Sequence, residues 1–522
     1  MKNGFLLTCF LLLVCSCNSI FEMMGENVDV EGNVIAHDMI VLGDQLEDPY
    51  SVDVMTKALE SVCPTKANRI NMDPTHIYVR FLPEDDEDFD RLADMGVQML
   101  DHPVDYEIVR EGDYYHDPSI DEEKITWQYA VVEPDFACPS GIRYEVLDEC
   151  YIPDDTGTKA DGIDWEAVER EAYRLSGNAS MLPPRTKADG TAPSGRVTIV
   201  DDDLNGAVEG VKGVTVSCNS FVKFGKAFTD ENGNYEMTTR FTANPRYRLL
   251  FKNRLGFAIG FNKLLVPAST STLGTNPPAG VDVEINSSSD RKMFTRCVVN
   301  NAGYDYYQQC KDSGTSAAIK TPPSNLRMWI FQGMDSSSTP MFQQGAIIDE
   351  SFIHDYLKDY TFLVKLFFPD ITLGVKGLTR YSDIYSTAIH ELSHASHYME
   401  VGNTYWNIYI KYIINSFVSS GFVTYGVGTE ENHGYCEVGE IWAYYVQSKL
   451  FRERYGIEKS FGTSNWFTPQ VLLTLDERGL NRYKIFQALL PTTTDMETFK
   501  KCLVSLYPEF KSAINQTFAM YD

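Results

Sequence analysis

The chain has 522 residues, and because domains usually hold about 100–200 residues, this length predicts roughly three folding units. With 43% hydrophobic and 23% charged residues, it is neither a disordered nor a fibrous chain. The net charge is −28, and no basic surface is expected that would displace counterions from phosphates, so nucleic acid is excluded as an expected partner.

The N-terminus has the form of a secretory signal. Lys2 precedes an apolar run over residues 5–14, which is too short to cross a bilayer as a permanent helix. Residues 14–17 read Val-Cys-Ser-Cys and resemble a bacterial lipobox, a likeness that implies cleavage after a signal peptide of this length and a lipid on Cys17. Residues 1–17 are therefore interpreted as a lipoprotein signal peptide with its lipobox, and the alternative is an ordinary signal peptide whose Cys residues are incidental.

The lipobox resemblance also implies a location. The chain would be anchored in the bacterial cell envelope, with the membrane as a partner through the lipid on Cys17. Asn18 and Ser19 follow, without the Asp that retains many lipoproteins at the inner membrane, so the outer membrane is favoured. Residues 18–45 are polar and are interpreted as a tether.

Residues 46–190 form an acidic, mixed α/β region in this interpretation. Residues 1–190 hold 40 of the 73 acidic side chains and 14 of the 45 basic ones. Alternation predicts strands over residues 75–81 and 97–100, with a helix between them from residue 86 to 95. Because Asp-x-Asp-x-Asp-Gly calcium loops are absent, a solvated shell or a spacer is favoured over a cation-binding surface. A short helix over residues 165–175 leads into a polar linker.

A central β-sandwich is predicted over residues 195–285. Short alternating segments recur with Gly and Asn between them, as in an all-β unit. The Gly-x-Val opening at 195, the Gly-Val-x-Val strand at 213 and the Thr-Asp-x-x-Gly-x-Tyr turn at 229 resemble the carboxypeptidase regulatory-like module. The resemblance implies a fold and no catalysis.

Long helical patterns dominate residues 320–522 and predict a mostly α domain. The predicted helices cover residues 383–401, 403–419, 436–455, 468–490 and 495–518. The fold class predicted for the whole chain is therefore multidomain α+β. Eight Cys lie beyond the signal, and none forms a Cys-x-x-Cys pair. Cys138 with Cys150 and Cys297 with Cys310 are spaced either for short disulfide loops or as buried thiols.

The motif that carries chemistry is His-Glu-x-x-His over residues 390–394. On a helix, His390 and His394 lie four residues apart on one face, so both imidazoles can bind one zinc ion. Glu391 then lies beside the metal-bound water as the general base. An apolar face at steps of three and four, which includes Leu392 and Met399, would anchor the helix in a core.

A third zinc ligand is needed, and two carboxylates compete for the role. Glu440 lies in an otherwise apolar helical segment, where an uncompensated carboxylate would cost several kcal/mol. Glu437 lies one turn earlier. His397 is too far along the helix from His390 to share a metal, and a His at 397 where Gly is required departs from the metzincin pattern.

The Glu-x-Trp-Ala sequence that starts at Glu440 resembles the second signature of gluzincin metallopeptidases. This resemblance implies a zincin-like domain with Glu440 as third ligand, zinc as cofactor, and a peptide or protein as substrate. The alternatives are a cell-surface binding lipoprotein with a non-catalytic zinc site, and an inhibited precursor in which residues 45–190 are a pro-region.

Several further residues have two interpretations. Tyr435, Tyr444 and His433 are either hydrogen-bond donors to an oxyanion or packing residues. Residues 369–375 form either the edge strand that aligns an extended peptide or a structural strand. His354 is interpreted as a residue on an ordinary helix surface.

Overall fold

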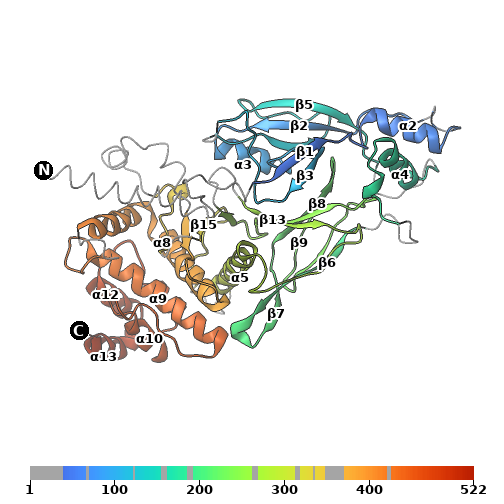
Figure 1. The fold of residues 1–522 in the computed structure, drawn as a ribbon. Helices are drawn as coiled ribbons and strands as arrows, with labels where there is room; N and C mark the ends of the chain where they lie inside the picture. Colours follow the sequence, from blue (N-terminus) through green and yellow to red (C-terminus); the bar gives the residue numbers. More distant parts are fainter. Residues whose placement is uncertain are drawn as a thin grey trace, which may run out of the picture.

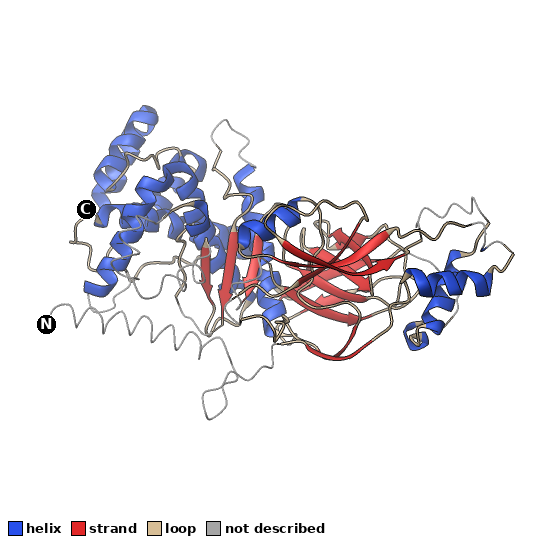
Figure 2. Ribbon diagram, turned by 90° about the horizontal axis from the view of Figure 1, so that it is seen from above, coloured by secondary structure: helices blue, strands red, loops and turns tan. Residues whose placement is uncertain are grey.

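The computed structural model describes residues 39–521 with short interruptions. The residues not described within that span are 66, 68–69, 122–123, 154–161, 185–191, 262–267, 312–317, 333–335, 347–369 and 420–424. The structure is mixed α and β, as the sequence predicted (Figures 1 and 2). Most helices gather at one end, the strands fill the middle, and a few helices lie at the other end of the molecule.

The N-terminal part contains two small antiparallel sheets. One pairs β1 with β3, and the other has the strand order β4-β2-β5. The strands are β1 (Val41–Gln45), β2 (His76–Leu82), β3 (Tyr106–Arg110), β4 (Gln128–Val132) and β5 (Arg143–Cys150). The helices are α2 (Val52–Val62), α3 (Asp86–Asp94) and α4 (Trp165–Leu175).

The predictions for this part are confirmed unevenly. The helix predicted over residues 165–175 matches α4, whose first turn is capped by the side chain of Asp164. A strand and a helix follow one another as predicted in β2 and α3. Residues 97–100 are not a strand: only Leu100 is bridged, to Tyr129 of β4.

The central part contains two four-stranded sheets. In the first, β6 pairs with β7, β10 and β14, and in the second the order is β13-β11-β8-β9. The strands are β6 (Ser194–Asp201), β7 (Ala207–Gly210), β8 (Thr215–Ser220), β9 (Lys223–Phe228), β10 (Asn234–Glu236), β11 (Arg246–Leu250), β13 (Thr270–Thr275) and β14 (Val283–Ile285). The turn predicted before Tyr235 is present, and Gly233 occupies it at φ +82°.

A small parallel sheet joins the central part to the C-terminal part. Its order is β12-β15-β16, with β12 (Ala258–Phe261) pairing with β15 (Arg327–Phe331) and β15 with β16 (Ile371–Gly374). The long helix α5 (Arg291–Lys311) runs between the two parts in Figure 1 and packs against α8. β12 thus lies within the segment predicted as a sandwich but belongs to a different sheet.

Helices form the C-terminal part. They are α8 (Tyr381–Ser419), α9 (His433–Tyr455), α10 (Gln470–Glu477), α11 (Arg482–Phe486), α12 (Met496–Leu506) and α13 (Lys511–Tyr521). The break predicted at residue 402 is confirmed, because Gly402 has non-helical angles (φ 74°, ψ 178°) inside α8. The prediction of single helices over residues 468–490 and 495–518 is wrong, since the first segment is divided into α10 and α11 and the second into α12 and α13.

One hydrophobic core runs through the central and C-terminal parts. Val216 of β8, Val298 of α5, Leu392 of α8 and Trp442 of α9 all belong to it and are buried. The N-terminal part has two smaller cores. Asp113 of the N-terminal part forms ion pairs with Lys292 and Arg296 of α5. Within the described residues, no helix combines the length and the apolar character that crossing a membrane requires.

Candidate metal centre

The first arm of α8 carries the His-Glu-x-x-His sequence and is held from two sides. The hydroxyl of Tyr306 in α5 donates to Oγ of Ser396 over 2.9 Å. Nε1 of Trp442 in α9 donates to the carbonyl of Ser393 over 3.1 Å. Met399, predicted on the apolar face, is 39% exposed at the end of this arm, so the anchoring face ends before it.

His390, His394 and Glu440 meet between α8 and α9. Their ligand atoms lie within 4.8 Å of one another, and the three side chains are buried. The two Nε2 atoms of His390 and His394 are 3.2 Å apart. Nε2 of His390 is 3.5 Å from Oε2 of Glu440, and Nε2 of His394 is 3.5 Å from Oε1.

These separations fit a single small metal ion. Two ligand atoms at about 2.05 Å from one zinc ion, at the tetrahedral angle, lie about 3.3 Å apart. The two nitrogens are 3.2 Å apart, and each is 3.5 Å from a different oxygen of Glu440, so all three separations are close to this value. Oε2 of Glu440 accepts no hydrogen bond among the described residues. Two nitrogens and one oxygen of this kind suit zinc, with a fourth position left for water or substrate.

The electrostatics of the three groups also favour a bound cation. Burial raises the pKa of Glu440, but the imidazoles of His394 and His390 outweigh it and hold this pKa well below its usual range. Burial lowers the pKa of His390, but the carboxylates of Glu440 and Glu391 outweigh it and raise this pKa. The site thus stabilises positive charge that is enclosed by protein.

Glu391 points to a partner from outside the two helices. Oγ1 of Thr339 donates to Oε2 of Glu391 over 2.7 Å. Glu391 is 5% exposed, and its burial raises its pKa. The imidazoles of His390 and His394 lower this pKa, but burial outweighs them. A raised pKa makes the carboxylate a better proton acceptor. No pattern in the sequence pointed to Thr339.

The break in α8 supplies a second contact that the sequence did not indicate. Because the helix changes direction at Gly402, its second arm folds back toward the first. The ring of Tyr409 lies 5.9 Å from that of His394, and its hydroxyl donates to Oε1 of Glu440 over 2.6 Å. Tyr409 is therefore the residue that orients the third candidate ligand.

Glu437 does not belong to the group formed by the two imidazoles and Glu440. Burial raises its pKa, and the neighbouring charge of His433 lowers it in part. Nδ1 of His433 lies 2.9 Å from the carbonyl of Glu430, and the ring of Tyr435 packs on Tyr405 at 4.6 Å. His433 and Tyr435 thus contact Glu430 and Tyr405, which are outside the candidate metal group.

Tyr444 lies beside the site. Its ring centroid is 4.3 Å from that of His390, and its hydroxyl is 3.1 Å from that of Tyr425. Burial raises the pKa of Tyr425, and the charge of Glu440 raises it further. Tyr425 has a left-handed backbone (φ 67°), and its carbonyl accepts hydrogen bonds from Tyr412 and Trp466. Two phenols therefore lie on the α9 side of the imidazoles.

His397 is buried and packs on Tyr405 and Trp406 at ring distances of 5.3 and 5.6 Å. Burial lowers the pKa of His397 to about 3, with the charge of His394 adding to the effect. It is therefore a neutral core residue, and it is not part of the candidate metal group.

The strand predicted over residues 369–375 is present as β16, at the edge of its sheet. Its outer edge is occupied at Thr372, whose N–H and carbonyl both bond Ser338. Oγ of Ser337 accepts from the N–H of Gly374 over 3.1 Å. The segment that contacts Glu391 through Thr339 thus lies along the edge where an extended peptide was expected.

Other predicted residues lie elsewhere. Cys17 and His354 lie outside the described residues. The eight Cys from Cys63 to Cys502 are all free thiols, so neither of the two spacings considered forms a disulfide.

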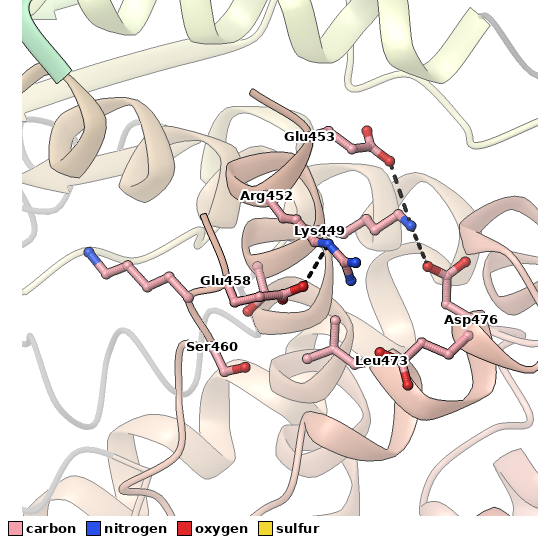
Figure 3. Close-up of a pocket in the computed structure, with 10 residues that line it drawn as sticks. Lys449, Arg452, Glu453, Glu458, Ser460, Leu473 and Asp476 are labelled. Atoms are coloured by element: carbon pink, nitrogen blue, oxygen red, sulfur yellow. Dashed lines mark ion pairs between the residues drawn. The ribbon is translucent and has the colours of Figure 1, made fainter. Parts of the chain in front are cut away.

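A hollow of about 380 Å³ lies between α9 and α10 (Figure 3). Lys449 pairs with Asp476 at 2.6 Å and with Glu453 at 3.8 Å, and Arg452 pairs with Glu458 at 2.8 Å. Figure 3 shows these side chains turned toward one another. Because the charges neutralise each other, this α9–α10 hollow is not a candidate site.

Comparisons of the chain with protein-family models, with curated proteins and with solved structures found no match.

Proposed function

We propose that the protein is a zinc-dependent metallopeptidase. The observation that carries the proposal is the convergence of His390, His394 and Glu440 at separations of 3.2–3.5 Å, with Glu391 next to them in the chain. Two His and one Glu, with a neighbouring carboxylate as base, are the protein groups that catalytic zinc sites of this kind require.

His390, His394 and Glu440 would hold the ion, with Tyr409 orienting the carboxylate. Zinc bound there would supply Lewis acidity, which lowers the pKa of a water and polarises a carbonyl. Glu391 would take a proton from the attacking water and return it to the leaving amine. Thr339 would fix the direction of the Glu391 carboxylate.

The hydroxyls of Tyr444 and Tyr425 bond each other, so one phenol would donate to its neighbour and the other would donate to charge that develops on a substrate oxygen. Each phenol has a raised pKa, from burial first and from the charge of Glu440 second, so it keeps its proton at neutral pH. A phenol that keeps its proton can stabilise an oxyanion. The substrate class that follows is a peptide or protein.

The finer domain assignment belongs to the same proposal. We infer a regulatory-like β-sandwich in residues 195–285, supported by the two four-stranded sheets, and a zincin-like domain in residues 320–522, supported by α8 and α9. The lipid anchor on Cys17 is supported by residues 14–17, and its place in the outer membrane by Asn18 and Ser19.

One observation favours the rival function, a cell-surface binding lipoprotein. The site residues are nearly enclosed, and the segment around Ser338 covers the outer edge of β16. A chain whose site is closed in this way would bind zinc and cleave nothing.

The Glu391→Gln variant tests the proposal. It keeps the shape of the side chain and the hydrogen bond from Thr339 but removes the proton acceptor, so zinc content should stay near one per chain while peptide cleavage falls by at least about a hundredfold. Glu437→Gln is the matched control on α9 and should retain cleavage. A peptide library left uncut by the zinc-loaded wild type would favour the binding rival, and undiminished cleavage by Glu391→Gln would dismiss the mechanism.

A further inference from the structure

The N-terminal part contains a pocket that the metal centre does not explain. It has a volume of about 730 Å³ and lies between β1 and β3 on one side and the face of β2, β4 and β5 on the other. This volume lies within the range of small-molecule sites, about 300–1,000 Å³.

Carboxylates and phenols line this pocket. The acidic residues are Glu47, Asp48, Asp105, Asp117 and Asp148. In the part of the chain that the structure describes, none of the five forms a recorded ion pair with Lys or Arg. The α9–α10 hollow differs in this respect, because Lys449 and Arg452 neutralise its carboxylates. Apart from Asp48, whose pKa burial raises to about 8, the carboxylates of the N-terminal pocket therefore give it a negative potential.

Arg80 is the one basic residue among the lining side chains, and its charge is already paired. Its Nε and Nη2 donate to Oε2 of Glu145 over 2.9 and 2.6 Å. Its guanidinium also lies 4.2 Å from the centroid of a Trp127 ring. Glu145 also pairs with Arg143 at 2.6 Å, so this cluster keeps one positive charge, which offsets the charge of only one of the acidic lining residues.

Asp48 is the member of the lining that points to a ligand. It is only 7% exposed, and its Oδ1 accepts from the N–H of Tyr50 over 2.8 Å. Its Oδ2 has no hydrogen-bond partner among the described residues. Burial raises the pKa of Asp48 to about 8, and the charges of Asp148 and Asp105 add to the effect. A buried carboxyl oxygen without a partner usually costs free energy, which a donor from a ligand would recover.

The shape and chemistry of the lining select among cations. A bare metal ion is disfavoured, because the carboxylates of this pocket do not converge within the described residues as His390, His394 and Glu440 do. Four phenol rings line the pocket, among them Tyr78 and Tyr129 with centroids 6.2 Å apart. Aromatic faces attract ammonium and guanidinium groups, and carboxylates accept their hydrogen bonds.

We propose that this pocket binds a ligand through an ammonium or guanidinium group that donates to Asp48 and lies near Asp148 and the tyrosine rings. The group would belong either to a Lys or Arg side chain of a peptide or to a free polyamine. Asp105 has a supporting role, because Tyr78 and Gln45 already donate to its two oxygens. The inference is independent of the metal centre.

The test is calorimetric titration of the full chain with three probes. The probes are tetralysine with a capped N-terminus, the same capped peptide with acetylated side chains, and spermidine. Tetralysine or spermidine should bind, and side-chain acetylation should weaken the peptide by at least about tenfold because it removes the four ammonium charges. Preference for tetralysine would identify a peptide ligand, and preference for spermidine would identify a free amine.

Three variants locate the binding. Asp48→Asn keeps the acceptor for Tyr50 and should weaken binding by about tenfold. Asp148→Asn, at an exposed position where misfolding is not a concern, should weaken it in the same direction. Glu497→Gln removes the same charge from exposed α12 and should change nothing. Failure of both amines to bind, equal binding of the acetylated peptide, or equal loss in all three variants would overturn the proposal.

Discussion

Tyr409→Phe is the substitution that most sharply separates a ligand-orienting contact from ordinary packing. It removes one hydroxyl and leaves the ring against Trp406 and His394. The lost hydrogen bond is 2.6 Å long and ends on a buried carboxylate oxygen of Glu440. Hydrogen bonds to charged acceptors contribute about 1.5–3 kcal/mol.

That energy bounds the effect on zinc binding. At about 1.4 kcal/mol per factor of ten, the full hydrogen bond corresponds to a loss of about 10- to 100-fold. The metal-free protein also has this hydrogen bond, so the upper figure is a ceiling. Residues that orient metal ligands typically contribute in the same range. We therefore expect the zinc dissociation constant of Tyr409→Phe to rise by about tenfold or somewhat more.

The assay is competition for zinc with a chelator of known affinity, and the chain offers a matched control. Tyr405 lies one turn earlier on the same arm of α8 and donates to the carbonyl of Thr493 over 3.1 Å, away from the ligands. Tyr405→Phe should leave the zinc dissociation constant unchanged. An unchanged constant for Tyr409→Phe, or an equal loss in both variants, would refute the role of Tyr409.

Three further predictions concern the site and the anchor. Zinc binding should weaken as the pH falls through the raised pKa of His390, because a proton held there competes with the metal; affinities measured between pH 5.5 and 8 that do not rise with pH would contradict this. Glu440→Ala should abolish tight zinc binding and Glu437→Ala should weaken it far less, as measured by chelator competition; the reverse order would shift the third ligand by one helical turn. Cys17→Ala should move the protein from the membrane fraction to the soluble fraction, and a variant that still sediments with membranes would exclude the lipid anchor.

Local signals in the sequence were sufficient for several elements. The helix over residues 165–175 has its cap at Asp164, and the break at Gly402 requires a positive φ that glycine adopts without strain. The spacing of His390 and His394 was sufficient to expect two imidazoles on one helix face.

The sequence also contained signals for helix breaks, but the apolar periodicity outweighed them in the prediction. The helix expected over residues 468–490 is divided where Gly479 adopts φ +100° and Asn481 caps the next helix. The helix expected over residues 495–518 is interrupted where Pro508 follows the end of α12. In both segments the apolar pattern continues across the break.

The contacts that complete the site had no local signal. Thr339 comes from a segment 52 residues before Glu391, and Tyr409 reaches Glu440 only because the second arm of α8 folds back. Both contacts are products of tertiary packing. The pocket around Asp48 has the same origin, because its carboxylates come from separate strands and loops of an acidic region that was interpreted as a solvated shell or a spacer.

The central claim is that one zinc ion is held by His390, His394 and Glu440. Anomalous diffraction from crystals of the zinc-loaded full chain, recorded on both sides of the zinc edge, tests it most directly. The account predicts one strong peak at about 2.0–2.2 Å from Nε2 of both imidazoles and from a Glu440 oxygen. A peak coordinated by other residues, or none at this position, would contradict it.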